Sequence, residues 1–197
     1  GQPVAKRYEK ASAHLTSLAQ AIDHDLDIFV SVRRPTAYLN SAYCQMLLGG
    51  LILPFDVYKA HNPLSSIDWF DLIGQLRAAK GVGQVVVWRY EDYTQVYPKI
   101  IAGLVGQTQL PHIPRVKRTI NEGLSAAAVA QVLADSADDD AAQLGYTARG
   151  ALPVGADYPA FDGYTAAEHA AGDEVYLAQL AAIAALEGVT ILRPDPA

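Results

Sequence analysis

Cysteine is nearly absent from the sequence, which has 197 residues and a single cysteine, Cys44. One thiol excludes an internal disulfide and any metal site built from several cysteines, and it fits a reducing compartment such as the cytoplasm. Basic residues are also in deficit: 15 lysines and arginines stand against 21 acidic residues, and the formal net charge is −6. Because binding to nucleic acid usually needs a basic face, nucleic acid is not an expected partner.

Long apolar runs are missing as well. Charge or proline interrupts every apolar stretch well before the roughly 20 residues that cross a bilayer, so the sequence predicts no membrane span. The first residues, GQPVAKRYEK, contain neither an initiator methionine nor a signal pattern, which leaves open a start inside a longer protein. With 51% hydrophobic and 18% charged residues, the chain is expected to form one globular domain over residues 1–197.

Short segments rich in β-branched residues alternate along the chain with segments of helical spacing. The predicted strands cover residues 26–32, 84–90 and the VTIL segment at 189–192. Such alternation is typical of an α/β fold, and we expect a three-layer sandwich with a mainly parallel sheet. Ligands of such sheets bind at the carboxyl ends of the strands, where Arg33 and the segment 89–91 lie.

The predicted helices are defined by apolar spacing and by capping signals. The first two cover residues 4–22 and the segment from Pro35 to a stop at Gly49-Gly50. The next two are SIDWFDLIGQLRAAK, capped by Ser65 or Ser66 and ended by Gly81, and 91–106, which should end or kink at Pro98. The last two are 124–134, capped by Ser125 or Asn121, and 165–186, which a capping box of Thr165 and Glu168 opens. Residues 135–164 hold turn formers and little periodicity, which predicts loops and short turns.

The segment SVRRPTAYLNSAY, residues 31–43, places two arginines at the end of a predicted strand and a serine eight positions after the first of them. A helix that begins near Pro35 leaves its first N–H groups free, which favours an anion at this turn. Arg33, with Arg34 beside it, adds hydrogen-bond donors suited to phosphate or carboxylate. Ser41 lies six residues after Pro35, which places it about 9 Å from Pro35 along the helix axis. In the alternative, the arginines are solvated and Ser41 is a small residue at a helix packing contact.

The same segment resembles the 3′-phosphate-binding motif of the sulfotransferases that use 3′-phosphoadenosine 5′-phosphosulfate (PAPS). In that family a strand-end arginine and a serine eight residues later hold the 3′-phosphate, which implies this role for Arg33 and Ser41. The family often has an acidic residue or asparagine between the arginine and the proline, where this chain has Arg34. The resemblance implies PAPS as the co-substrate and the P-loop nucleotide-binding fold of the sulfotransferases.

A second segment, VVVWRYED at 85–92, is similar to the family's strand ending in Tyr-Glu-Asp. The tyrosine of that strand contacts adenine, which implies this role for Tyr90; the alternative is a core tyrosine at a strand end. The segment RTINEGLS at 118–125 and the closing run from residue 167 resemble the distal half of bacterial sulfotransferase-like proteins. The likeness therefore extends from about residue 25 to the end of the sequence.

Part of the family's site has no counterpart in this sequence. The glycine-rich phosphate loop, with its lysine, belongs before the arginine and serine motif, and only 32 residues precede Arg33. KGVG at 80–83 precedes a predicted strand instead of following one, and GLVGQTQ at 103–109 follows a helix and has no lysine. No catalytic residue can be assigned. We expect either a fold incomplete at the amino terminus through truncation, the favoured explanation, or a non-catalytic relative.

None of the five histidines matches the family's catalytic base, and ordinary surface or hydrogen-bonded roles are expected for His14, His24, His61, His112 and His169. No histidine pair has metal-ligand spacing with a third partner, so no metal is predicted. The acidic run at 138–140 is expected to be a solvated loop, with weak calcium binding as the alternative. Trp69 and Trp88 are expected to be core aromatics.

These features favour a PAPS-dependent sulfotransferase, active if the missing amino-terminal part is supplied, with a hydroxyl or amine acceptor on a sugar, lipid or small metabolite. Its partners are then the adenine nucleotide and an unidentified acceptor, and a homo-oligomer is left open. One alternative is a non-catalytic nucleotide-binding or protein-interaction module on the same fold. Another is an unrelated α/β enzyme in which Arg33 binds a different anion.

Overall fold

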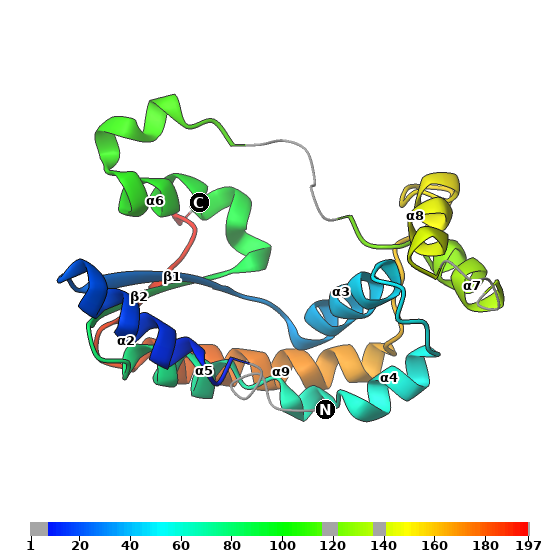
Figure 1. Cartoon of the computed structure of the whole chain (residues 1–197), viewed down its shortest axis with the longest axis horizontal. Helices are drawn as coiled ribbons and strands as arrows, with labels where there is room; N and C mark the ends of the chain where they lie inside the picture. Colours follow the sequence, from blue (N-terminus) through cyan, green and yellow to red (C-terminus); the bar gives the residue numbers. More distant parts are fainter. Residues whose placement is uncertain (1–7, 116–121, 136–140, 197) are drawn as a thin grey trace. The chain divides into compact units, whose positions relative to one another are not determined.

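The computed structural model describes residues 8–115, 122–135 and 141–196 (Figure 1). Its contacts divide the chain into two compact units. The division defines a sheet unit, formed by Gln2–Arg34, Ser65–Lys117 and Asp173–Ala197, and a helical unit, formed by Pro35–Leu64 and Arg118–Gly172. The expected single domain over residues 1–197 stays a prediction.

Three parallel strands form the centre of the sheet unit, in the order β1 (Leu26–Val32), β2 (Val82–Arg89) and β3 (Val189–Leu192). The register sets Val32 opposite Arg89 and Trp88 opposite Leu192, so the three strands end at the same edge. β-Branched residues dominate these segments and pack well on a pleated, buried surface. The predicted bounds are confirmed for β1 and β3, and β2 begins two residues earlier than the predicted 84–90.

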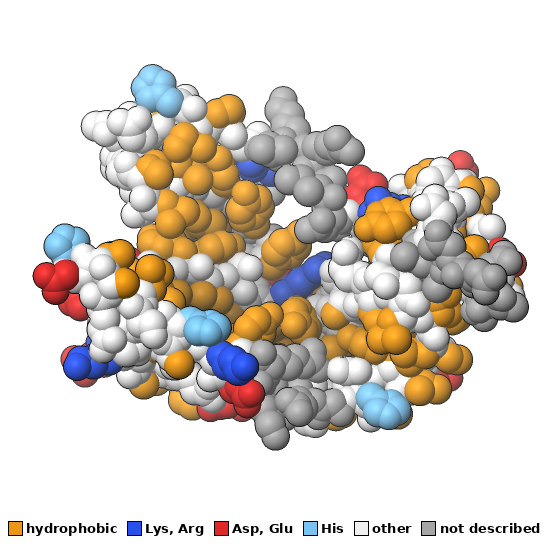
Figure 2. Space-filling view, in the orientation of Figure 1, with side chains coloured by type: hydrophobic (Ala, Val, Ile, Leu, Met, Phe, Trp, Pro, Cys, Tyr) orange, Lys and Arg blue, Asp and Glu red, His pale blue; other side chains and the backbone are white. Residues whose placement is uncertain are grey.

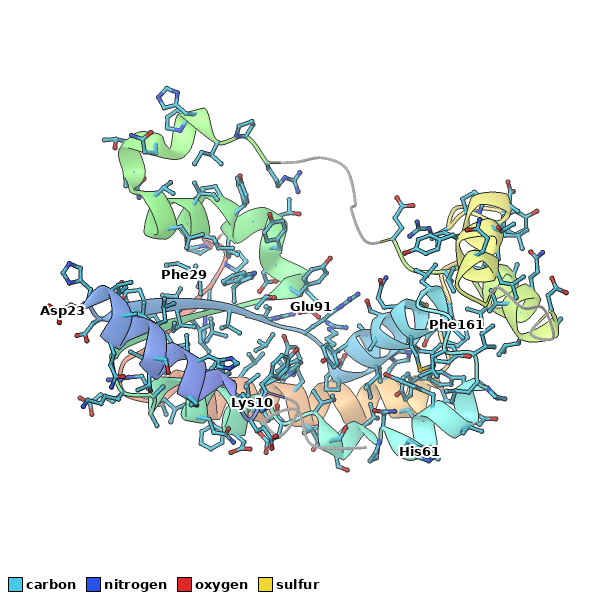
Figure 3. The ribbon with its side chains drawn as sticks, in the orientation of Figure 1. Lys10, Asp23, Phe29, His61, Glu91 and Phe161 are labelled. Carbon is cyan, nitrogen blue, oxygen red and sulfur yellow. The ribbon has the colours of Figure 1, made fainter. Side chains whose placement is uncertain are left out.

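Helices cover both faces of this sheet. Figure 1 shows α6 (Tyr93–Val105) on one face, and α2 (Ala11–Ile22) and α5 (Trp69–Arg77) on the other. The packing of α6 is close, because a Cβ placed on Gly103 would lie 2.8 Å from Cζ of Phe29, which Figure 3 labels on β1. The predicted α/β fold with a parallel sheet is confirmed.

The core of the sheet unit joins the strands to these helices. Its fully buried side chains come from β1, β2, α5, α6 and the later part of α9 (Ala166–Ala184), and include Val32, Ile73, Val85, Val87, Val96 and Ile183. The outer side of α6 is different, since Tyr93, Leu104 and Val105 are exposed. Figure 2 shows hydrophobic side chains gathered over this helix.

Two helix predictions in the sheet unit need correction. The helix predicted after Ser65 or Ser66 begins at Trp69, because the side chain of Asp68 is the cap: its Oδ1 accepts the N–H of Asp71 at 2.9 Å. The two serines lie in or beside the short 3-10 turn η1 (Leu64–Ser66). Helix α6 continues through Pro98, so the predicted end there is wrong and the alternative, a kink, stays a prediction. Pro98 is exposed, so water can reach the carbonyl group that lacks its helical donor.

Helices build the helical unit: α3 (Pro35–Leu48), α4 (Phe55–His61), α7 (Ala126–Ala134), α8 (Ala141–Ala151) and the first part of α9 (Ala166–Ala184). The predicted start at Pro35 and the capping role of Ser125 are confirmed: Ser125 Oγ accepts the N–H of Ala128 at 3.0 Å. The alternative cap, Asn121, and the acidic run at 138–140 lie outside the described residues.

The prediction of loops and short turns over 135–164 is wrong for α8. Small residues place this helix close to α3, since a Cβ on Gly145 would lie 3.0 Å from the Cα of Leu48. Gly145 and Gly150 lower the helix propensity of this segment, which hid the helix in the sequence, and tertiary packing stabilises it in the structure.

Aromatic rings in edge-to-face and tilted contacts form a cluster in the core of the helical unit. The ring centroids of Tyr43 lie 5.0 Å from Phe55 and 5.2 Å from Phe161. The hydroxyl of Tyr43 donates to the carbonyl of Leu53 at 2.9 Å, and burial raises its pKa to about 12. Gly163 packs against this cluster so closely that a Cβ there would clash with the ring of Phe55. Only glycine fits at this position.

Candidate functional site

The carboxyl ends of β1 and β2 bring together residues that the sequence set about 57 positions apart. Because the strands are parallel and Val32 is opposite Arg89, Arg33 and Tyr90 follow their strands at the same edge of the sheet. All of these residues belong to the sheet unit. We call the group formed by Arg33, Arg34 and residues 89–91 the strand-end edge.

Arg33 and Tyr90 are in direct contact at the strand-end edge. The guanidinium carbon of Arg33 lies over the Tyr90 ring, 4.6 Å from its centroid. A cation over an aromatic face is attracted by the ring's electron density. Tyr90 is 49% exposed, which contradicts the alternative of a core tyrosine. Within the described part of the chain, Arg33 forms no ion pair with a carboxylate.

Glu91 fixes the turn that follows β1, a role that sequence analysis missed. Its Oε1 accepts the N–H of Arg34 at 2.9 Å, and its Oε2 accepts the hydroxyl hydrogen of Tyr176 at 3.2 Å. Figure 3 shows Glu91 beside the end of β1. Burial, and secondly the negative charge of Glu91, raise the pKa of Tyr176, so this hydroxyl stays protonated and remains a donor.

Two further contacts hold the same turn. The indole Nε1 of Trp69 donates to the carbonyl of Arg33 at 2.8 Å, and the Arg34 guanidinium lies 3.2 Å from the carboxylate of Asp173. Trp69 is buried, as expected of a core aromatic, whereas Trp88 is only half-buried. Side chains from three other segments therefore position the backbone before Pro35. The Arg33 side chain makes no hydrogen bond to a described residue, so its donors are available to a ligand.

Arg89 is the second arginine at this edge whose side chain is incompletely paired. Its Nε lies 3.5 Å from Asp92 and 4.0 Å from Glu91, within range of ion pairs. These contacts are not aligned as hydrogen bonds, and the buried Nε has no hydrogen-bond partner in the described part of the chain. The edge therefore holds cationic groups with unused donors.

Ser41 lies in α3 and belongs to the helical unit, whereas Arg33 belongs to the sheet unit. The side chain of Ser41 is half-buried and makes no hydrogen bond to the residues that the structure describes. Its predicted pairing with Arg33 on one phosphate stays a prediction. The contact between Arg33 and Tyr90 is the part of the predicted site that the structure brings together.

The helical unit contains a separate set of linked polar side chains, which we call the polar chain: Asn40, Asp162, His169 and Thr36. Asn40 Nδ2 donates to Asp162 Oδ1 at 2.8 Å, and Asn40 Oδ1 accepts the N–H of Gly163 at 3.2 Å. His169 lies 2.8 Å from Asp162 Oδ2 through Nε2 and 2.8 Å from the Thr36 hydroxyl through Nδ1. A proton on Nε2 lets the ring donate to Asp162 and accept from Thr36.

The carboxylates near the start of α9 are stabilised in their ionised forms. Partial burial alone raises the pKa of Asp162, but the donors on Tyr164, Asn40 and His169 outweigh it and lower the pKa overall. The ammonium group of Lys59 and the N–H of Thr165 lower the pKa of Glu168 to about 2. The backbone N–H of Thr165 donates to Glu168 Oε2 at 2.9 Å, and the N–H of Glu168 donates to Thr165 Oγ1 at 3.3 Å, so the predicted capping box is confirmed.

The polar chain resembles a hydroxyl, imidazole and carboxylate relay, but its hydroxyl is not accessible to a substrate. Thr36 is only 2% exposed. Its hydroxyl is therefore enclosed within the unit, and the geometry supports a structural clamp between α3 and the loop before α9. His169 is hydrogen-bonded through both ring nitrogens, in line with the ordinary role expected for it.

The remaining expectations concern metals and membranes. In the described ranges, no group of three or more His, Cys, Asp or Glu side chains is placed to hold a metal ion. No helix among the described residues combines the length and apolar character needed to cross a bilayer. Cys44 is buried within α3, and burial raises the pKa of its thiol.

Comparison with protein-family models, curated proteins and solved structures finds no match to this chain. The α/β class is defined by the parallel sheet itself. Any narrower assignment has to come from the motif residues and their geometry.

Proposed function

We propose that this chain supplies the 3′-phosphate and adenine half of a PAPS site, in a sulfotransferase of the P-loop nucleotide-binding fold. The observation that carries the proposal is the contact between the Arg33 guanidinium and the exposed Tyr90 ring, 4.6 Å to the centroid, at the ends of adjacent parallel strands. Ligands of open parallel sheets bind outside the carboxyl ends of the strands, which is where this pair lies.

The two side chains suit the two parts of the nucleotide. Arg33 presents a planar set of donors with no carboxylate partner among the described residues, so a phosphate can take them without breaking an ion pair. Tyr90 is half exposed, and adenine can stack on the face of its ring that the Arg33 guanidinium does not cover. The hydroxyl of Ser41 would add a donor to the 3′-phosphate, on the strength of the motif.

Sulfuryl transfer also needs a positive group and a base, in addition to Arg33, Ser41 and Tyr90. Transfer breaks the bond between sulfur and the bridging oxygen of PAPS and forms a bond between sulfur and the acceptor oxygen or nitrogen. Negative charge builds on the bridging oxygen, so positive charge must lie beside it, and a base must take the acceptor's proton. The motif residues Arg33, Ser41 and Tyr90 supply neither the positive group at the bridging oxygen nor the base. The acceptor class, a hydroxyl or amine, follows from the same proposal.

The test compares two nucleotides that differ by the 3′-phosphate. Adenosine 3′,5′-bisphosphate and adenosine 5′-monophosphate are titrated into the protein by calorimetry. We expect the bisphosphate to bind more tightly, and Arg33→Ala to weaken it by about tenfold to a hundredfold while changing the monophosphate little, since a charge-assisted phosphate contact contributes about 1.5 to 3 kcal/mol. Tyr90→Ala should weaken both nucleotides.

Arg149→Ala is the matched control, because Arg149 also lies over an exposed tyrosine, 5.0 Å from the centroid of Tyr146, but in the helical unit. This variant should bind both nucleotides as the parent does. Equal binding of the two nucleotides by the parent, or an Arg33→Ala variant that keeps the preference, would contradict the proposal. Selective binding without sulfuryl transfer from PAPS, in a protein that also carries the amino-terminal phosphate loop, would favour the non-catalytic module.

A further inference from the structure

A pocket lies in the sheet unit, where β2 and β3 end beside α9. Its volume is about 450 Å³, which is within the range of small-molecule sites. Leu177 and Leu180 from α9 and Ile191 from β3 line it with apolar surface. Leu177 is 58% exposed, so part of this apolar surface is accessible to a ligand.

Charged side chains also line this pocket. Arg89 and Arg193 contribute two cations. Arg89 lies within ion-pair range of Asp92, which also lines the pocket, and of Glu91, so Arg193 is the lining cation without a carboxylate partner among the described residues. The Nε of Arg89 is buried and has no hydrogen-bond partner among the described residues. One singly charged anion would supply the partner that Arg193 lacks.

The segment that carries Arg193 is held by its backbone. The ammonium group of Lys99 donates to the carbonyl of Arg193 at 2.8 Å and pairs with Asp195 at 2.6 Å. The guanidinium of Arg193 makes no ion pair with a residue that the structure describes. A fixed backbone with an unpaired guanidinium is suited to hold the head group of a ligand.

We propose that this pocket binds a small amphipathic monocarboxylate. The carboxylate takes donors from Arg193 and Arg89, and the aliphatic part covers Leu177, Leu180 and Ile191. A single negative charge matches the one unpaired guanidinium of the pocket, that of Arg193, better than a phosphate dianion does. The site goes beyond the nucleotide function, since neither Arg33 nor Tyr90 lines it.

Octanoate, titrated below its micelle concentration and followed by protein NMR chemical shifts, is the probe. We expect it to shift the signals of pocket residues and to bind at least about tenfold more tightly than octan-1-ol, which has the same chain without the charge. Arg193→Gln should weaken octanoate by about tenfold, and Ala181→Trp, which fills the pocket from α9, should abolish binding.

Arg149→Gln, in the other unit, is the control and should bind octanoate as the parent does. Arg33→Ala should also leave octanoate binding unchanged, so the pocket can fail or hold independently of the nucleotide site. The absence of octanoate binding, equal affinity of octanoate and octan-1-ol, or parent-like affinity in Arg193→Gln would each overturn the proposal. If Ala181→Trp fails to fold, the affinity of Arg193→Gln for octanoate and the comparison with octan-1-ol still test the proposed site.

Discussion

The polar chain of the helical unit and the strand-end edge of the sheet unit use polar side chains in opposite ways. In the polar chain, Asn40, Asp162 and His169 satisfy one another and the neighbouring backbone. At the strand-end edge, Arg33 has no carboxylate partner and the Nε of Arg89 has no hydrogen-bond partner among the described residues. Both regions are polar, but only the strand-end edge leaves donors unused.

The difference separates stabilisation from binding. A closed set of hydrogen bonds lowers the free energy of the folded state and leaves no group for a ligand. Unused donors contribute little to folding, and they are the groups that a ligand can satisfy. Substitutions in the polar chain should therefore lower stability, whereas substitution of Arg33 should lower ligand binding.

The largest effect on stability is expected for Asn40→Ala. The substitution removes a donor from Asp162 and an acceptor from the N–H of Gly163, both part-buried, which should lower the free energy of unfolding by about 2 kcal/mol. Urea unfolding gives the measurement. Gln45→Ala, at an exposed position of the same helix, should change it by less than about 0.5 kcal/mol. Equal free energies of unfolding for Asn40→Ala and Gln45→Ala would contradict a stabilising role of the polar chain.

A smaller effect is expected for Tyr176→Phe in the sheet unit. The buried hydroxyl donates to Glu91, so its loss should cost about 1 kcal/mol in unfolding experiments, because one part-buried acceptor loses its donor. Tyr146→Phe, whose ring is 51% exposed, should be neutral. A neutral Tyr176→Phe would show that Glu91 holds the turn through the N–H of Arg34 alone.

The smallest effect is a dependence of stability on acid pH. The folded-state pKa of Glu168 is about 2, below the ordinary value of 4.5, so its ionised form is the one that folding stabilises. That contribution is present above about pH 4.5 and is lost as the pH falls toward 2. Urea midpoints measured at pH 6 and pH 3 should differ less in Glu168→Gln than in the parent. An exposed neighbour, Glu174→Gln, should keep the parent's difference.

Much of the sheet unit could be predicted from local sequence. The strands are short runs of β-branched residues, and the parallel arrangement sets Arg33 and Tyr90 at one edge because parallel strands end together. The cap of α5 was assigned to the wrong residue, since Ser66 and Asp68 are both good caps and the sequence does not say which one the chain selects.

The partners of the functional side chains could not be predicted. Glu91 is 85 positions from Tyr176, and Thr36 is 133 positions from His169. No local spacing links residues that far apart, and only the packing of α9 brings them together. Helix α8 was missed for a related reason: its contact with α3 depends on the absence of a side chain at Gly145, which a search for apolar periodicity does not detect.

The contact between Gly163 and the ring of Phe55 also restricts how this chain can evolve. Any residue larger than glycine at that position must be accompanied by a smaller one at 55, so the two sites should change together or not at all. A divergent sequence that keeps a glycine just before a tyrosine, and an aromatic residue about a hundred positions earlier, would be recognisable as a relative when overall similarity is too low to show it.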